Sequence, residues 1–140
     1  HSAVHNHRFT FTPRVLKGTQ VNIRADLEIM RPGDGTHLLI SHNGPRSEKG
    51  GRLSYPVADV NVLHREAERY RPGEEYFMPA YEYHETPCSG VVITLMRKHE
   101  EGTIHANSVC RRGIEFHYDF DRFQLSPEQL FAYVVDALRG

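Results

Sequence analysis

The sequence lacks the features that would brace a chain covalently or hold it in a membrane. Its 140 residues include only two cysteines, Cys88 and Cys110, which are too few for a disulfide framework. No apolar run reaches the ~18 residues that a membrane-spanning helix needs, and no stretch has the composition of a secretory signal peptide. These absences predict a protein of the reducing cytoplasm with no membrane partner.

An excess of charge of one sign is lacking as well. Seventeen Lys and Arg residues against eighteen Asp and Glu residues leave a formal net charge of −1. A nucleic-acid-binding domain normally carries a basic excess, so this balance argues against a nucleic-acid partner. The length fits a single domain, residues 1–140, and a chain of this size buries enough surface to fold without a metal ion or a disulfide.

Short strands separated by turn signals are expected over most of the chain. Alternating or continuous apolar residues predict strands at 21–29, 91–96 and 114–121, of which 91–96 is the most fully buried, and less regular strands are expected at 36–41, 59–69, 75–78 and 104–110. Many short strands of this kind are typical of an all-β sandwich or barrel.

Only the C-terminal segment has a helical pattern. Ser126 is the expected N-cap, Pro127 suits the first helical position, and Gln129 completes a capping box. Five apolar residues then recur on one stripe: Leu130, Phe131, Val134, Val135 and Leu138. This stripe predicts a final helix that packs back onto the sheet.

Histidine is the abundant residue, with ten copies in the chain. Its imidazole ring is the commonest side-chain ligand of transition metals. A first strand is expected over residues 5–16, and the two-residue period of a strand places four rings on one face: His5, His7, Phe9 and Phe11. Neighbouring side chains on one face start ~6.5–7 Å apart, so the two imidazoles can converge on one ion, which needs a third ligand from elsewhere.

The spacing of these residues resembles that of the cupin superfamily, whose first motif has the form G-x5-H-x-H-x3,4-E-x6-G and whose second has the form G-x5-P-x-G-x2-H-x3-N. The first motif is matched by His5, His7 and Gly18, with Phe11 at the carboxylate position. The second is matched by Gly73, Pro79 and His84, with Tyr81 at the second glycine position and Cys88 at the asparagine position. The resemblance implies a double-stranded β-helix, or jelly-roll barrel, followed by the C-terminal helix.

Because Phe11 cannot ligate a metal, the resemblance implies a three-histidine site formed by His5, His7 and His84, as in thiol-dioxygenase-like cupins. Those proteins bind Fe(II), while Mn, Ni and Zn are alternatives that imidazole also accepts. Three ligands leave positions open for a small organic substrate and O₂, which implies a non-haem iron oxygenase. A metal-dependent isomerase, lyase or epimerase is one alternative. A non-catalytic ligand-binding barrel is another, and it expects His5 and His84 to lie far apart.

Several tyrosines lie shortly before the third histidine. Thiol dioxygenases of this resemblance often carry a tyrosine on the strand after that histidine, where it orients substrate and O₂. Residues 86–116 contain none, which counts against thiol oxidation. The tyrosines that precede the histidine are the candidates instead, with Tyr81 and Tyr83 in catalytic roles and Tyr76 in substrate binding.

Further candidates follow from strand parity. His64 shares the parity of Val60 and Val62, so it is a candidate fourth ligand or general base. A partly apolar substrate pocket is expected from Phe9, Phe11 and Met78. Arg14 and Arg24 are candidates for binding a substrate carboxylate, although both have the outward parity that favours a surface position.

The remaining features concern the rest of the chain. Surface, turn or sheet-exterior positions are expected for five further histidines: His37, His42, His99, His105 and His117. The sequence begins inside its own first motif, which predicts a barrel that lacks its N-terminal strands in this chain. A sheet edge left open in this way favours a homodimer.

Overall fold

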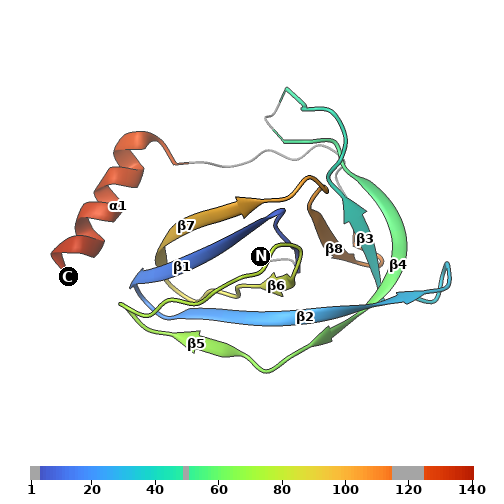
Figure 1. Ribbon diagram of the computed structural model, residues 1–140, viewed down its shortest axis with the longest axis horizontal. Coiled ribbons are helices and arrows are strands. Elements are labelled where there is room, and N and C mark those ends of the chain that lie inside the picture. Colours follow the sequence, from blue (N-terminus) through green and yellow to red (C-terminus); the bar gives the residue numbers. More distant parts are fainter. Residues whose placement is uncertain (1–3, 49–50, 115–124) are drawn as a thin grey trace.

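The computed structural model describes residues 4–48, 51–114 and 125–140. Within these ranges the regular elements are β1 (Phe9–Lys17), β2 (Gln20–Met30), β3 (His37–Ser41), β4 (Tyr55–His64), β5 (Glu68–Tyr70), β6 (Tyr83–Glu85), β7 (Ile93–Glu101), β8 (Asn107–Arg111) and α1 (Pro127–Arg139). The prediction of a mostly-β protein with one C-terminal helix is confirmed (Figure 1).

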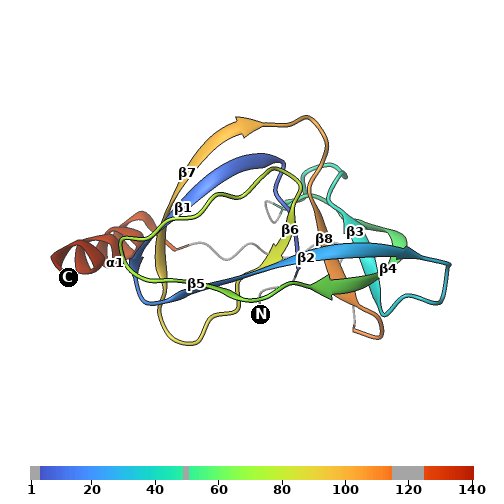
Figure 2. The ribbon, with the colours of Figure 1, turned by 60° about the horizontal axis from the view of Figure 1, so that its bottom comes forward.

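The strands form two antiparallel sheets. β1 pairs with β7, and the larger sheet has the order β5-β2-β4-β3-β8, with β6 added on β2. The long strand β2 runs from the end of the molecule that holds β1 and β7 to the end that holds β3, β4 and β8 (Figures 1 and 2). Among the described strands these pairings make two sheets rather than a closed barrel.

The segment before β1, which contains His5 and His7, pairs with two strands of the larger sheet. His5 forms isolated bridges to His84 of β6 and to Ser108 of β8. Its backbone exchanges two hydrogen bonds with His84, each of 2.9 Å, and the neighbouring Asn6 N–H donates to Asn107 O at 3.0 Å. The N-terminal segment therefore lies between β6 and β8, although the continuous strand predicted over 5–16 begins only at Phe9.

Three other predicted strands need correction. The strand expected at 59–69 is divided into β4 and β5, which pair with different parts of β2: β4 pairs with residues 25–30 and β5 with residues 20–22. Residues 75–78 make only single bridges, from Glu75 to Arg14 and from Met78 to Phe11, so they are not a strand. The strand expected at 104–110 is β8, which begins later. Of the strand predicted at 114–121, residues 115–121 lie outside the described residues.

The strand predicted at 91–96 is exposed rather than buried. It corresponds to β7, in which Leu95 is 60% and Met96 47% exposed. Among the described strands β7 pairs only with β1, and its side chains from Thr94 to Glu101 are exposed. A continuous apolar run was therefore a misleading signal of burial here.

The start of helix α1 was predicted correctly, but its packing was not. The Ser126 side chain accepts from Gln129 N–H, and the Gln129 side chain accepts in return from Ser126 N–H, which completes the capping box. The apolar stripe is exposed, however, with Phe131 at 69% and Leu138 at 71%. The helix stands at the end of the molecule beside β1 and β7 (Figure 1). Lys17 of β1 forms an ion pair with Asp136 of the helix.

Two apolar clusters form the interior. One contains buried Val4, Ala25, Val60 and Val109, and the other contains buried Phe11, Tyr76 and Met78. The second cluster is the one that adjoins the histidines. Among the described residues, no helix has the length and apolar character that crossing a membrane requires.

Candidate metal centre

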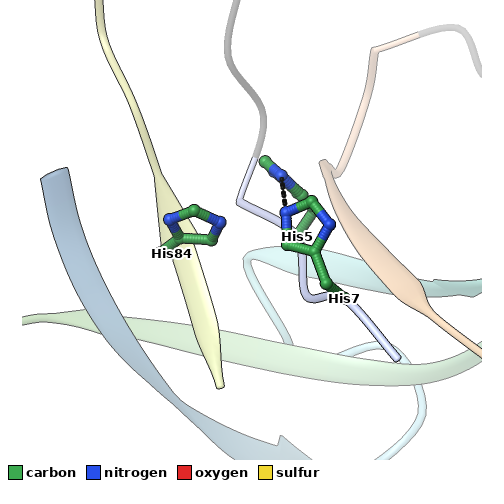
Figure 3. Close-up of side chains that lie close together, drawn as sticks. All are labelled: His5, His7 and His84. Carbon is green, nitrogen blue, oxygen red and sulfur yellow. Dashed lines mark hydrogen bonds between the residues drawn. The ribbon is translucent and has the colours of Figure 1, made fainter. Parts of the chain in front are cut away.

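Three histidines converge on one point of the interior. One ring nitrogen from each of His5, His7 and His84 lies within 4.8 Å of the others, and the His5 ring centroid is 4.8 Å from that of His84 (Figure 3). The non-catalytic hypothesis expected these two residues to lie far apart, and that expectation is wrong. The prediction that His5 and His7 project on one side together with Phe9 and Phe11 is confirmed by ring contacts along the series.

The backbone of the N-terminal segment holds His5 and His7 in place from both sides. Asn6, which lies between them and is 5% exposed, points the other way and accepts from Asn107 N–H at 2.7 Å. On the site side, Tyr81 N–H donates to His7 O at 2.8 Å. These hydrogen bonds hold the backbone of residues 5–7 extended, so that the His5 and His7 side chains point to the same side, although only His5 forms a β-bridge.

The spacing of His5 and His7 suits a shared ion. Their Nε2 atoms are 3.1 Å apart. Two imidazole ligands at about 2.1 Å from an ion and at right angles to each other lie about 3 Å apart, so this pair already has the separation of adjacent ligands. Figure 3 shows these two rings close together, joined by a dashed line between ring nitrogens, with the His84 ring on β6 beside them.

The two ring nitrogens of His84 have the environments expected of a metal-binding histidine. The residue is 3% exposed, and its Nδ1 lies 2.7 Å from Asn22 Oδ1. Its Nε2 is buried and has no hydrogen-bond partner among the described residues. A buried polar atom without a partner costs free energy, so its position among two other imidazoles fits a coordination bond. The residues present therefore fit a divalent metal ion.

Burial keeps the His7 and His84 rings neutral, as metal coordination requires. Burial, followed by the nearby His5, lowers the pKa of His7 from 6.5 to about 4. Burial, followed by His5, His7 and Arg24, lowers the pKa of His84 to about 3. Both residues are therefore neutral at pH 7, and each has one unprotonated ring nitrogen.

These pKa values predict that mild acid destabilises the metal-free protein. In the unfolded chain both histidines titrate near ~6.5, so at pH 5 the unfolded state binds more protons than the folded state. The stability is present above pH ~6.5 and is lost as the pH falls toward the folded pKa values of about 4 and about 3. After allowance for solvent screening, we expect the free energy of unfolding to fall by about 2 kcal/mol between pH 7 and pH 5.

Urea unfolding in the presence of a chelator measures this fall. A His7→Gln variant is the comparison, because it removes one of the two rings, and it should lose about half as much stability over the same interval. The pKa of His37 is lowered as well, by burial, Arg111 and His64, but this contribution is common to the parent and the variant, so the difference between them reports His7. Equal stability of the parent at pH 7 and pH 5 contradicts the prediction.

Two of the residues predicted to line an apolar pocket are fully buried next to the histidines. Phe11 is 2% and Met78 0% exposed, and the Phe11 ring lies 4.8 Å from that of His7. Tyr76 is buried and stacks on Tyr70 with ring centroids 4.3 Å apart. Burial, followed by the neighbouring Tyr70, raises the pKa of Tyr76 to about 12. These side chains give the histidines an apolar floor from which water is excluded.

The structure directs the three predicted catalytic side chains to other partners. His64 Nε2 lies 3.2 Å from Glu85 Oε1, and the Tyr83 hydroxyl accepts from Asn107 Nδ2 at 3.2 Å. Residues 83 and 85 flank His84 on a strand, so their side chains face the opposite side from the cluster. The Tyr81 hydroxyl is bound to the backbone N–H and C=O of Ile104, each at 3.1 Å.

The two arginines behave differently from each other. Arg14 is exposed on the outward side of β1, as its parity predicted. The surface position predicted for Arg24 is wrong, because its side chain is only 17% exposed and lies between Glu68 and Glu82, at 2.9 Å from each. Arg24 is thus held by two carboxylates, whereas a substrate carboxylate would need a free guanidinium.

Sequence reasoning missed the polar residues behind His84. The alternation in β2 placed Asn22 on the solvent side, yet this residue is 0% exposed, while Ile29 on the expected core side is 67% exposed. Hydrogen bonds from Asn22 and Arg24 outweigh burial and lower the pKa of Glu68. A histidine that binds a metal through one ring nitrogen usually donates the proton of the other to an acceptor. This requirement could have directed attention to a buried polar residue such as Asn22.

The other histidines mostly follow expectation. His99 and His105 are exposed. His42 differs, because it is half-buried with its ring between Ser54 and Ser108, each at 2.6 Å. His117 lies outside the described residues.

Comparison with known proteins identifies no relative. No family model matches the chain, and no curated protein and no solved structure is significantly similar to it. The geometry of the three histidines is therefore the finding from which a function is inferred.

Proposed function

We propose that this chain is a mononuclear metal-dependent enzyme with a cupin-like jelly-roll architecture, and that it is a non-haem Fe(II) oxygenase of a small organic substrate. The observation that carries the proposal is the convergence of His5, His7 and His84, with a buried Nε2 of His84 that has no partner among the described residues. Fe(II) bound by three imidazoles supplies open coordination positions for a substrate and O₂.

Backbone conformation at the motif glycine positions supports the cupin part of the proposal. Gly18 and Gly73, which match glycines of the two motifs, have φ values of 77° and 92°. Tyr81 stands where the second motif has its other glycine, and it has a φ of 65°, the one positive value at a non-glycine residue among the described residues. Positive φ is the conformation that favours glycine, so all three positions have the geometry for which the motif selects glycine. At Gly18 the turn also requires it, because a Cβ would lie 2.4 Å from Val91 O.

Strand pairing supports the jelly-roll part of the proposal. β2 pairs with β6 and β4, β4 with β3, and β3 with β8. The bridges of His5 to His84 and to Ser108 link β6 with β8 across the N-terminal segment. The N-terminal segment thus pairs with both β6 and β8, as a further strand between them would, and His5 lies directly opposite His84 in this pairing.

The protein's own residues would do three things in such a reaction. The three imidazoles hold the ion, and His84 is held in turn by Asn22. Phe11 and Met78 form an apolar floor that excludes water from one side. His5 and His7 are less buried than His84, so a ligand would approach the ion from their side.

Oxygen uptake tests the proposal. The protein is loaded with Fe(II) without air, and an oxygen electrode then records uptake with a panel of small thiols, phenols and carboxylic acids. We expect uptake that depends on both iron and one substrate class and that a His7→Ala variant loses. Metal-dependent turnover without oxygen uptake would instead indicate an isomerase, lyase or epimerase, and a protein that retains no metal contradicts the proposal altogether.

A further inference from the structure

A row of polar side chains leads away from the metal cluster behind His84. The His84 Nδ1 atom lies 2.7 Å from Asn22 Oδ1, and Asn22 Nδ2 lies 2.7 Å from Glu68 Oε2. The other oxygen of Glu68 accepts from Arg24 Nε at 2.9 Å. We propose that Asn22 and Glu68 are positioning residues that fix His84 in the tautomer protonated at Nδ1, so that Nε2 presents its lone pair to the ion; this inference rests on the proposed metal site.

Strand register places these residues together independently of their rotamers. Asn22 of β2 is directly opposite Glu68 of β5, and Arg24 of β2 is directly opposite His84 of β6. Residues directly opposite each other, and residues two apart on a strand, share one face of a sheet. All four side chains therefore share a face, and Asn22 lies next to both His84 and Glu68.

The chemistry of Glu68 settles which way the Asn22 amide points. A carboxylate that accepts from Arg24 is ionised and has no proton to donate, so only the NH₂ group of Asn22 can face it. The same NH₂ group lies 3.7 Å from the Met78 sulfur, a weak acceptor. The carbonyl oxygen of Asn22 is thus the atom that faces His84, and because it can only accept, the proton of His84 is on Nδ1.

This tautomer is the one that the metal site needs. His84 is 3% exposed, and its Nε2 has no partner among the described residues. A proton on Nε2 would leave a buried donor without an acceptor and would block the lone pair that coordinates a metal. Fixing the proton on Nδ1 therefore prepares the ligand before the ion arrives.

A Glu68→Gln variant tests the inference with almost no change of shape. Arg24 can only donate, so the introduced glutamine turns its carbonyl oxygen toward Arg24 and its NH₂ group toward Asn22. The Asn22 amide then turns over and offers its own NH₂ group to His84. His84 Nδ1 becomes an acceptor, and its proton moves to Nε2.

Glu82→Gln is the matched control. Glu82 also accepts from Arg24, at 2.9 Å, and the substitution removes the same single negative charge. No hydrogen bond links the Glu82 and Asn22 side chains among the described residues, so the orientation of the amide should not change. A difference between the two variants therefore reports the amide orientation rather than the loss of charge.

Nitrogen-15 NMR of the metal-free full chain at pH 7.5 measures the tautomer directly. In the parent and in Glu82→Gln we expect the His84 Nδ1 signal to have the shift of a protonated ring nitrogen and the Nε2 signal that of an unprotonated one. In Glu68→Gln we expect the two to exchange roles. A parent His84 protonated at Nε2, or identical spectra for the two variants, overturns the inference.

Titration with Co²⁺ alone supplies the second readout. Glu68→Gln should weaken binding by about 10-fold, within the range of outer-shell substitutions, whereas Glu82→Gln should change it by less than about threefold. Equal weakening in both variants would count against the inference. Because the NMR readout needs no metal, a protein with the expected tautomers that binds no metal would refute the proposed function and leave the tautomer inference standing.

Discussion

A His84→Ala variant is expected to bind a divalent metal at least about 100-fold more weakly than the parent chain. Outer-shell substitutions already cost about 10–100-fold in metal affinity, and this variant removes a ligand itself. It removes the ring whose buried Nε2 has no partner among the described residues, and it leaves only the His5 and His7 pair. Competition titration with Co²⁺ and iron analysis after native purification both measure the loss.

Two further variants control for a non-specific loss of metal binding. His99→Ala makes the same change at an exposed histidine that contacts Thr12 and should bind metal as the parent does. His7→Ala removes a less buried ligand and should weaken binding to a similar extent as His84→Ala, which guards against a loss caused by unfolding alone. If His84→Ala retains as much iron as the parent, the three-histidine site is refuted.

A Phe11→Ala variant is expected to lower the free energy of unfolding by about 3–5 kcal/mol, the usual cost of truncating a buried phenylalanine. The Phe11 side chain is 2% exposed and contacts the rings of His7 and Phe9, and it packs in the same cluster as Met78. A phenylalanine cannot ligate a metal, and the Phe11 ring instead packs against the His7 ring.

Urea unfolding measures this cost, with Phe77→Ala as the control. Phe77 is 52% exposed, so the same truncation there should cost less than about 1 kcal/mol. Similar losses in the two variants would mean that Phe11 does not support the site in the way that the packing indicates.

The side-by-side placement of His5 and His7 could be predicted from the sequence because strand parity is a local property. His5 and His7 are two residues apart, so any extended backbone puts them on one side, even though the regular strand begins only at Phe9. His84 was found by its spacing from Gly73 and Pro79, and the positive φ of Gly73 accords with that motif. The His5 and His7 pair thus followed from a short-range pattern, whereas His84 followed from the resemblance of its spacing to a known motif.

The surroundings could not be predicted because they depend on tertiary packing. A two-residue alternation assumes that one face of a strand is wet, but Asn22 and Ala25 of β2 are both buried although they lie on opposite faces. The same assumption led to the wrong prediction that Arg24 lies on the surface. For helix α1, the capping residues are local and were predicted correctly, whereas the exposure of Phe131 depends on what lies beside the helix.

The most direct test of the account is a crystal structure of the protein loaded with Co²⁺, with anomalous diffraction used to find the metal. The account predicts one site per chain, with a nitrogen of each of His5, His7 and His84 at about 2.1 Å from the ion and His84 coordinating through Nε2. An ion bound elsewhere, or a loaded crystal with no anomalous peak among these three rings, would contradict it.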